Sequence, residues 1–179
     1  MNILFVCTGN ICRSPMGELL WPRSITDPSI QARSAGTYGL DGHAIAEHSR
    51  ELMERDGIDP SAFRSRRLTR EIAANADLIL CFEREQRGDI VTLAPNKVRR
   101  TFLLPDFANA AAYCARERFI TGATVADRLE SVIDNASLAR PMLPQVDDVP
   151  DPQGKDMQAF ERAHASIVAD LRTIADAVR

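Results

Sequence analysis

The chain alternates between short apolar segments and longer stretches in which apolar residues recur at helical spacing. The short segments have the length of strands, and they lie at residues 3–6, 30–35, 77–82 and 98–104. The longer stretches predict helices between and after these strands. Strands that alternate with helices are typical of a parallel sheet with right-handed crossovers, so we predict an α/β fold.

Turn and capping residues bound the predicted helices. Gly57 is expected as the C-terminal cap of one helix, and Thr69 as the N-terminal cap of the next. Residues 143–154 contain three prolines, which predicts an ordered loop with a restricted backbone before the last helix. The helices are predicted at residues 15–26, 44–55, 69–75, 83–93, 106–119, 125–138 and 155–178.

Length and composition agree with one globular domain over residues 1–179. No apolar run is long enough to span a bilayer, and no signal peptide is expected. The net charge of -3 gives no support to binding of nucleic acid or of an anionic membrane. The four cysteines are too few for a secreted disulfide scaffold of this length.

The first apolar segment leads into a polar loop that ends in a helix start. The strand stops at Cys7, and residues 8–10 are of types that favour a turn. Ser14 is expected as the N-cap of the next helix, with Pro15 at the first helical position. A strand, a tight loop and a helix start in this order predict a cradle of backbone N–H groups that binds an anion.

Cys7 and Arg13 enclose this loop, with five residues between them. At a helix N-terminus beside a guanidinium the thiolate form of a cysteine is favoured, which makes a nucleophile at neutral pH. An arginine can direct two N–H donors at phosphate oxygens. The pattern is the signature of cysteine-dependent phosphatases. The alternative is a buried cysteine and an ordinary helical arginine, and the strand–loop–helix context favours the phosphatase.

The loop resembles the phosphate loop of the low-molecular-weight protein tyrosine phosphatases over residues 6–16. Later segments are similar to that family at residues 34–37, 76–81 and 151–152. The resemblance implies three layers, with helices on both faces of a four-stranded parallel sheet in the order 2-1-3-4. It also implies that phosphotyrosine in proteins, or a small aryl phosphate, is hydrolysed through a covalent cysteinyl-phosphate on Cys7, with inorganic phosphate as product.

The resemblance implies a role for each residue of the site. Cys7 is the nucleophile, Arg13 holds the transferring phosphoryl group, and Asp151 is the general acid. Asp148 is the competing candidate for the acid, because the sequence does not show which carboxylate faces the site. Phosphate is expected to bind to the loop residues Thr8, Gly9, Asn10, Ile11, Cys12, Arg13 and Ser14.

The resemblance also implies how the loop is held. Ser14 is expected to donate a hydrogen bond to the Cys7 thiolate, and Ser34 is expected to fix the side chain of Asn10. The family often completes this network with a histidine at the position where this chain has Phe63. The chain therefore departs from the family pattern in the support of its loop.

Other positions bear on the substrate. In the family, the segment that contains Tyr38 and Leu40 forms one wall of the cleft. The family often has aromatic residues after the Asp-Pro pair, whereas Gln153 and Gly154 follow it here. The reaction type is therefore predicted more firmly than a preference for aryl phosphates.

No metal or cofactor is expected in this chemistry. His43, His48 and His164 lack the spacing of a zinc site. A thiolate nucleophile needs a reducing compartment, so we expect a cytoplasmic protein. Cys12 lies in the same loop as Cys7, and it either forms a protective disulfide with an oxidised Cys7 or is only a small packing residue at the helix start.

Two sections leave alternatives open. Residues 108–146 are expected to be a helical insertion, because the family reaches its catalytic aspartate sooner. The basic residues 64–67 either recruit acidic sequences near a phosphosite or form a solvated patch. The alternatives for the whole protein are an arsenate reductase of the same fold, for which Cys81 and Cys114 would be the further thiols, and a weakly active phosphoprotein-binding module.

Overall fold

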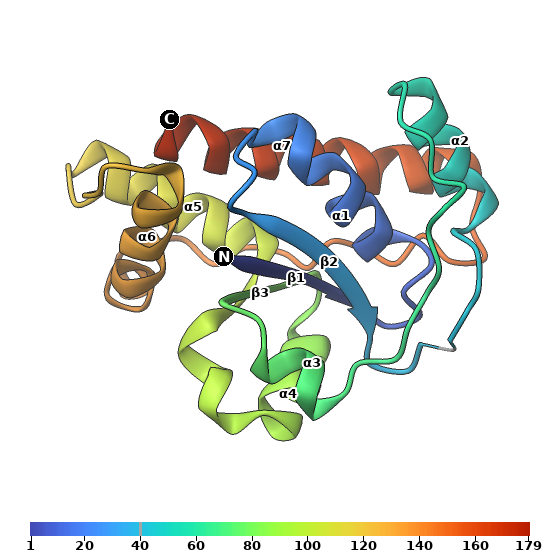
Figure 1. The fold of residues 1–179 in the computed structure, drawn as a ribbon, viewed down its shortest axis with the longest axis horizontal. Helices are drawn as coiled ribbons and strands as arrows, with labels where there is room; N and C mark the ends of the chain where they lie inside the picture. The colour runs from blue at the N-terminus through green and yellow to red at the C-terminus, as the bar shows by residue number, and fades with distance from the viewer. Residues whose placement is uncertain (40) are drawn as a thin grey trace.

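The computed structural model describes residues 1–39 and 41–179, so Leu40 lies outside the described residues. Its centre is a parallel sheet of four strands in the order β2-β1-β3-β4, which confirms the predicted order (Figure 1). The two central strands are buried along nearly their whole length. The strands are β1 (Asn2–Cys7), β2 (Gln31–Gly36), β3 (Leu78–Cys81) and β4 (Thr101–Leu103).

The predicted helices are all present, with boundaries that differ by a few residues. Thr69 accepts a hydrogen bond from the backbone N–H of Ile72, as expected of an N-cap, and Gly57 has the positive φ of 72° that suits a C-terminal cap. The bounds are α1 (Arg13–Ser24), α2 (Glu47–Arg55), α3 (Arg70–Ala74), α4 (Arg84–Leu93), α5 (Leu104–Arg116), α6 (Val125–Ala139) and α7 (Met157–Val178), with 3₁₀ helices η1 (Pro95–Arg100) and η2 (Arg140–Met142).

The predicted fourth strand begins too early. Residues 98–100 belong to η1, and only residues 101–103 pair with β3. Pro95 is compatible with a first helical turn, and the backbone carbonyl of Lys97 accepts a hydrogen bond of 2.8 Å from the hydroxyl of Thr101. Arg99 is exposed and Arg100 half-buried, so these residues do not suit a strand that is buried on both faces.

Helices cover both faces of the sheet, as predicted. Helices α1, α5 and α7 lie on one face and α3 and α4 on the other (Figure 1). Side chains along β1 alternate between the two layers: Ile3 and Phe5 join the larger apolar cluster with α1, α5 and α7, whereas Leu4 and Val6 join a smaller one with α3 and α4. Each of these buried side chains contributes roughly 1.5–3 kcal/mol, so the two clusters fix the position of β1.

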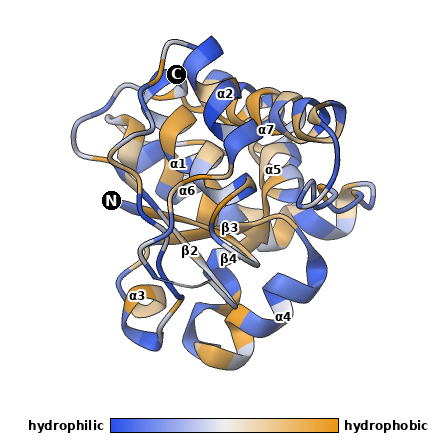
Figure 2. Cartoon of the chain, turned by 90° about the vertical axis from the view of Figure 1, so that its right-hand side faces the viewer, coloured by the Kyte–Doolittle hydropathy of each residue, from blue (hydrophilic) through white to orange (hydrophobic). Residues whose placement is uncertain are grey.

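The section after β4 is helical, as predicted. Helix α5 packs between the sheet and α7, and α6 lies against α5 at the end of the molecule away from α2 (Figure 1). The inner side of α6 is buried through Leu129, Val132 and Ile133. Hydrophobic residues line the strands and the inner sides of the helices, and hydrophilic residues cover their outer sides (Figure 2). That residues 108–146 are an insertion stays a prediction.

Within the described part of the chain, no helix combines the length and the apolar character needed to cross a membrane.

Candidate active site

The loop between β1 and α1 is more compact than the sequence suggests. Helix α1 begins at Arg13, with Cys12 as its N-cap, and the expected cap at Ser14 is wrong. The Ser14 hydroxyl is engaged elsewhere: it lies 3.0 Å from the sulfur of Cys7 and accepts a hydrogen bond of 2.9 Å from the side-chain amide of Asn10. The Ser14 hydroxyl thus contacts the sulfur of Cys7, and no side chain in the described part of the chain caps the N-terminus of the helix.

Asn10 ties the loop to its surroundings. It adopts a left-handed backbone conformation with φ of 55°, which asparagine tolerates better than most residues, and it is fully buried. Its side-chain amide also donates 2.8 Å to the hydroxyl of Ser34, the expected partner, and its oxygen accepts from the backbone N–H of Arg66 at 2.8 Å. These bonds stabilise the conformation that turns the loop around a central cavity.

Phe63 replaces the histidine that the resemblance led us to expect, and it packs into the apolar core. The loop is supported instead by the bonds to Asn10 and by Glu18, whose carboxylate accepts a hydrogen bond of 2.6 Å from the hydroxyl of Ser34. Burial raises the pKa of Glu18, and the hydrogen bond from Ser34 and the charges of Arg33 and Arg66 act against that rise. A buried polar network thus extends from α1 to the loop.

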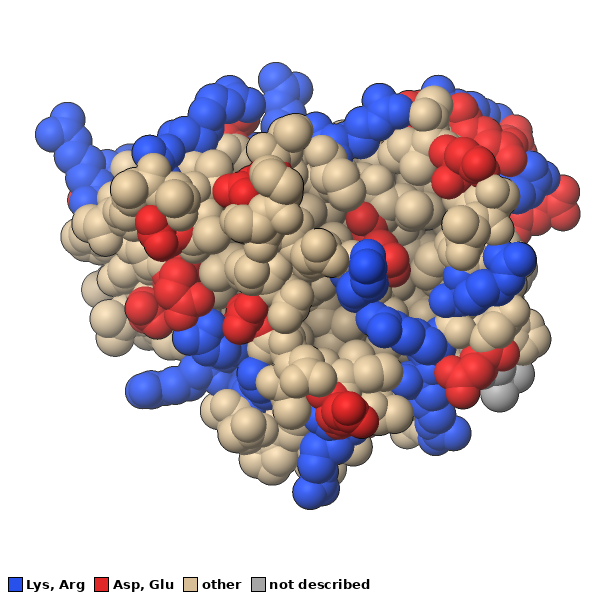
Figure 3. Space-filling view, viewed as in Figure 1, with Lys and Arg blue, Asp and Glu red and all other residues tan. Residues whose placement is uncertain are grey.

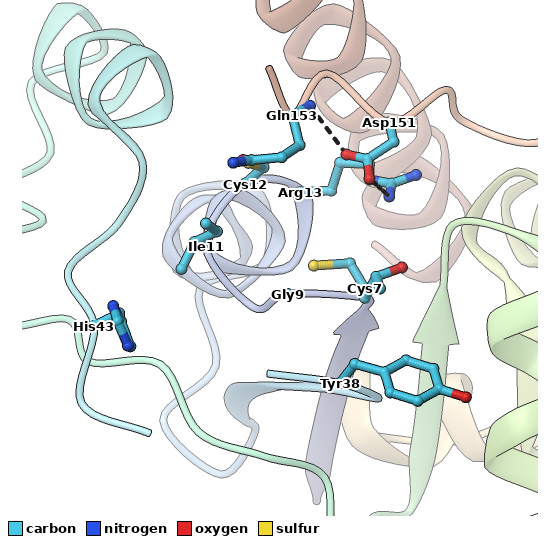
Figure 4. Close-up of a pocket in the computed structure, with 10 residues that line it drawn as sticks. Cys7, Gly9, Ile11, Cys12, Arg13, Tyr38, His43, Asp151 and Gln153 are labelled. Carbon is cyan, nitrogen blue, oxygen red and sulfur yellow. Dashed lines mark hydrogen bonds and ion pairs between the residues drawn. The ribbon is translucent and has the colours of Figure 1, made fainter. Parts of the chain in front are cut away.

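The loop forms one wall of a cavity of about 370 Å³. Figure 4 shows the thiol of Cys7 at the end of β1, with Arg13 and Asp151 on one side and Tyr38 on the other. No hydrogen bond among the described residues uses the backbone N–H groups of residues 8–12 as donors. These donors are thus available to an anion beside the N-terminus of α1, and phosphate binding at this loop stays a prediction.

Arg13 is buried, with 1% of its surface exposed, and it forms ion pairs with two carboxylates. Its Nη1 donates 2.7 Å to the carbonyl of Val149 and lies 3.1 Å from Oε1 of Glu83, and its Nη2 lies 3.2 Å from Oδ2 of Asp151. Its Nε is buried and has no partner among the described residues. A buried donor without an acceptor is costly, so this atom suits an added acceptor such as a phosphate oxygen.

Glu83 and Gln86 belong to the site and were missed from the sequence. Gln86 donates 2.6 Å to Glu83 and 3.1 Å to the hydroxyl of Thr8, so it links the first turn of α4 to the loop. The carboxylate of Glu83 pairs with Arg13. The spacing of Glu83 and Gln86 at the start of a helix resembles a capping box, but only the pairing of β1 with β3 brings them to the loop.

The two candidate acids lie in different environments. Asp151 lines the cavity, pairs with Arg13 and accepts a hydrogen bond of 3.1 Å from the backbone N–H of Gln153. Asp148 pairs with Arg84 at 2.8 Å and does not line the cavity. Val149 anchors the segment between them, since its backbone N–H donates 2.8 Å to the carbonyl of Phe82. The geometry therefore favours Asp151 as the acid.

Cys12 differs from Cys7 in its surroundings. Its sulfur donates 2.9 Å to the side-chain oxygen of Gln153, the residue that stands where the family often has an aromatic one. Burial raises the pKa of Cys12 to about 12, with further increases from Cys7 and Asp151 and a decrease from Arg13. Cys12 is therefore held as a thiol at neutral pH, and neither cysteine is in a disulfide.

Ile11 of the loop, Tyr38 and His43 also line the cavity. Tyr38 is 64% exposed, so its ring is available to a bound molecule, while Leu40, the other residue expected here, lies outside the described residues. The other histidines are engaged elsewhere: His164 lies 2.7 Å from Asp56, and His48 packs edge-on against Phe160. The described residues contain no cluster of three His, Cys, Asp or Glu that could hold a metal.

Comparisons with known proteins agree with this geometry. The family model described as low molecular weight phosphotyrosine protein phosphatase matches residues 2–117. The low molecular weight protein-tyrosine-phosphatase Etp of Escherichia coli K12 is 38% identical over 102 residues, which are 57% of this chain and 68% of that protein. A protein-arginine-phosphatase of Geobacillus stearothermophilus is 33% identical over 108 residues, 60% of this chain and 72% of its own.

Solved structures share the fold over nearly the whole chain. The tyrosine phosphatase Wzb from Escherichia coli K30, in complex with sulphate, matches with a TM-score of 0.72 and 24% identity over 98% of this chain and 96% of its own. The fold, the loop and the family model lead to one conclusion. The chain belongs to the low molecular weight phosphotyrosine protein phosphatase family.

Proposed function

We propose that this protein hydrolyses phosphomonoesters, phosphotyrosine in proteins above all, through a cysteinyl-phosphate intermediate on Cys7. The observation that carries the proposal is the convergence of three groups in one cavity: the thiol of Cys7, the guanidinium of Arg13, whose Nε has no partner among the described residues, and the carboxylate of Asp151. A nucleophile, a cationic clamp and an acid are the groups that phosphoryl transfer to and from a cysteine requires.

The first step is attack by Cys7. The phosphoryl oxygens bind to the N–H groups of residues 8–13 and to the guanidinium of Arg13, which places phosphorus in front of the sulfur. The sulfur forms a bond to phosphorus while the bond to the leaving oxygen breaks. Ser14 lies 3.0 Å from the sulfur and stabilises the thiolate before attack and as it departs.

The second role falls to Asp151. Its carboxyl group donates a proton to the leaving phenolate, and the resulting carboxylate then takes a proton from water that attacks the cysteinyl-phosphate. This releases inorganic phosphate and restores the thiolate. Val149 supports this role through two backbone hydrogen bonds. Its N–H donates to the carbonyl of Phe82 and its carbonyl accepts from Arg13, and together they fix the segment that carries Asp151.

The lining of the cavity supports an aryl phosphate as substrate. Ile11 and Tyr38 offer apolar surface beside the cradle, suited to the ring of phosphotyrosine. Gln153 takes the place of an aromatic residue, so one wall is polar. One relative is named a protein-arginine-phosphatase, and phosphoarginine is therefore included among the test substrates.

Arsenate reduction is disfavoured by the positions of the other thiols. Such a reductase passes a disulfide between cysteines, but Cys81 and Cys114 are fully buried, in β3 and α5. Burial raises the pKa of Cys81 to about 12 and also raises that of Cys114. Thiols that are inaccessible and protonated are poor relay partners.

We also infer that residues 1–179 act as a single phosphatase domain in a reducing, cytoplasmic environment. Helices α5 and α7 share one apolar cluster with β1, which carries Cys7, and this supports a common folding unit. The free thiols of all four cysteines support a reducing compartment.

Assays on four substrates test the proposal. We expect the protein to hydrolyse para-nitrophenyl phosphate and a phosphotyrosine peptide, with a higher kcat/KM for the peptide than for phosphoarginine. Arsenate reduction coupled to thioredoxin should be absent. Preference for phosphoarginine would reassign the substrate, and binding of the phosphopeptide without turnover of any substrate would leave a phosphoprotein-binding module.

A further inference from the structure

A second groove borders the candidate active site. It has a volume of about 420 Å³ and lies between α4 and the segment that leads into α3. Tyr38 lines both this groove and the catalytic cavity, so one side chain separates them. Arg67, Arg70 and Asp89 bring the charged groups of its lining. A peptide that leaves the catalytic cavity over Tyr38 therefore enters this groove.

Hydrogen bonds fix the groove relative to the nucleophile. The backbone N–H of Thr37 donates to the carbonyl of Cys7, and that of Tyr38 donates to the carbonyl of Thr8, each at 3.0 Å. On the other side, Gln86 bonds to Thr8, and Asp89 follows it one helical turn later in α4. The shared wall and α4 are thus both attached to the phosphate loop, and the spacing between the two hollows is set by the backbone.

The backbone of the basic segment is held while its charged groups stay available. The backbone N–H of Arg67 donates 2.8 Å to Asp41, and that of Leu68 donates 2.8 Å to the carbonyl of Gly36. The guanidinium groups of Arg67 and Arg70 are exposed, and neither forms a hydrogen bond or ion pair with another described residue. Two guanidinium groups and one carboxylate, that of Asp89, leave the lining with a positive charge.

The surface around the groove also carries positive charge. Lys and Arg side chains gather over β2 and the segment that leads to α3 in the view of Figure 3. An acidic peptide would therefore be attracted to this side of the catalytic cavity before it binds.

We propose that this groove is a subsite for an acidic residue, Asp or Glu, that flanks phosphotyrosine in the protein substrate. The inference rests on the proposed function and adds a recognition element to it. Guanidinium groups bind carboxylates through two parallel N–H donors, and Arg67 and Arg70 are free to do so. Because both are exposed, each pair contributes modestly and depends on ionic strength.

Two matched phosphotyrosine peptides test the subsite. They differ only in carrying Glu or Gln at the positions on either side of the phosphotyrosine, and kcat/KM is measured at low and at high salt. We expect the wild-type protein to prefer the Glu peptide by about threefold to tenfold at low salt, with a smaller ratio at high salt. The double variant Arg67→Gln, Arg70→Gln should lower the ratio to about one and leave para-nitrophenyl phosphate hydrolysis unchanged.

The control changes the net charge equally at sites away from the groove. Arg99 lies in η1 and Arg172 in α7, both exposed, so Arg99→Gln with Arg172→Gln should keep the preference for Glu. An equal loss in the control, or a preference that survives in the groove variant, would overturn the subsite. Absence of any preference in the wild type would also overturn the subsite. Turnover of para-nitrophenyl phosphate in that case would still support the proposed phosphatase activity. No turnover of any substrate would overturn both proposals.

Discussion

The two sides of the catalytic cavity are built in opposite ways. The phosphate loop, residues 7–14, is mostly buried and is held by bonds from α1, β2 and the segment before α3. The acid loop, residues 147–154, is more exposed, with 42% of the Asp151 side chain accessible, and the backbone of Val149 attaches it to Phe82. Two side chains of the phosphate loop bond to the acid loop: Arg13 to Val149 and Asp151, and Cys12 to Gln153.

This difference follows from what each side has to do. The phosphate loop presents donors to charge that develops on phosphoryl oxygens, and such donors act best when they do not have to reorient. The acid loop has to serve a leaving group in one step and water in the next, and both enter from solvent. Substitutions in the two loops should therefore have effects of different size and of different dependence on the substrate.

The largest effect is expected for the nucleophile. Cys7→Ser should lower kcat on para-nitrophenyl phosphate by more than about 10⁴-fold, because the serine hydroxyl is not ionised at neutral pH. Binding of inorganic phosphate should persist, since the backbone and Arg13 supply the cradle. Steady-state kinetics and calorimetric titration with phosphate measure the two quantities. Near-normal hydrolysis by the variant would rule out a covalent role for Cys7.

The next effect concerns the acid loop. Asp151→Asn should lower kcat on phenyl phosphate by about 10²–10⁴-fold, because the leaving phenolate then lacks its proton donor. The loss should shrink for para-nitrophenyl phosphate, whose leaving group departs without a proton. Asp148→Asn is the matched control and should change either rate little, since Asp148 pairs with Arg84 outside the cavity. A larger loss from Asp148→Asn would assign the acid to that residue.

A smaller effect is expected within the phosphate loop itself. Peroxide should oxidise the Cys7 thiolate to a sulfenic acid, and the thiol of Cys12 should then condense with it to a disulfide and water. After a reductant is added, the wild type should recover most of its activity and Cys12→Ser little. Activity before and after reduction, with mass spectrometry of the disulfide, measures this. Equal recovery without a Cys7–Cys12 disulfide would leave Cys12 as a packing residue bonded to Gln153.

The smallest effect lies outside both loops. Burial raises the pKa of Asp170, in α7, to about 6, and its buried Oδ2 has no partner among the described residues. For a carboxyl whose folded pKa is raised, stability is lost as pH rises from about 4 to about 6, because the charged form is penalised in the folded state. After allowance for partial exposure, Asp170→Asn should stabilise the protein by about 1–2 kcal/mol at pH 7.

Urea unfolding at pH 4 and pH 7 tests this sign. The variant and the wild type should unfold at nearly the same urea concentration at pH 4 and differ at pH 7, with unchanged kcat at both values. A stabilisation that is equal at the two pH values would mean that the charge of Asp170 is not its cause.

The same contrast explains what the sequence could predict. The phosphate loop is a local motif, so Cys7, Arg13 and the strand–loop–helix order could be identified from neighbouring residues. The N-cap at Ser14 was wrong because its hydroxyl bonds to Cys7 and Asn10, a choice that tertiary packing makes. The acid loop could be found only through its resemblance to a family, since proximity of Asp151 to Arg13 depends on contacts across the whole chain.

Contacts between distant elements account for the remaining misses. Glu83 and Gln86 look like ordinary residues at a helix start, and their reach to Thr8 and Arg13 follows from the register of β1 with β3. The start of β4 was placed too early because apolar Val98 resembles a strand residue, whereas Pro95 begins a 3₁₀ turn that includes it. Periodicity identifies elements, and packing decides where they begin and which polar groups they share.

The central claim is that Cys7 carries the phosphoryl group, and trapping the intermediate tests it most directly. The Asp151→Asn variant is mixed with para-nitrophenyl phosphate, whose leaving group departs without a proton, stopped in denaturant within the first turnover and digested for mass spectrometry. Slow attack by water in this variant should leave phosphate on the peptide that contains Cys7, together with a burst of para-nitrophenolate. Turnover with phosphate on another residue, or with no phosphate on Cys7, would contradict the account.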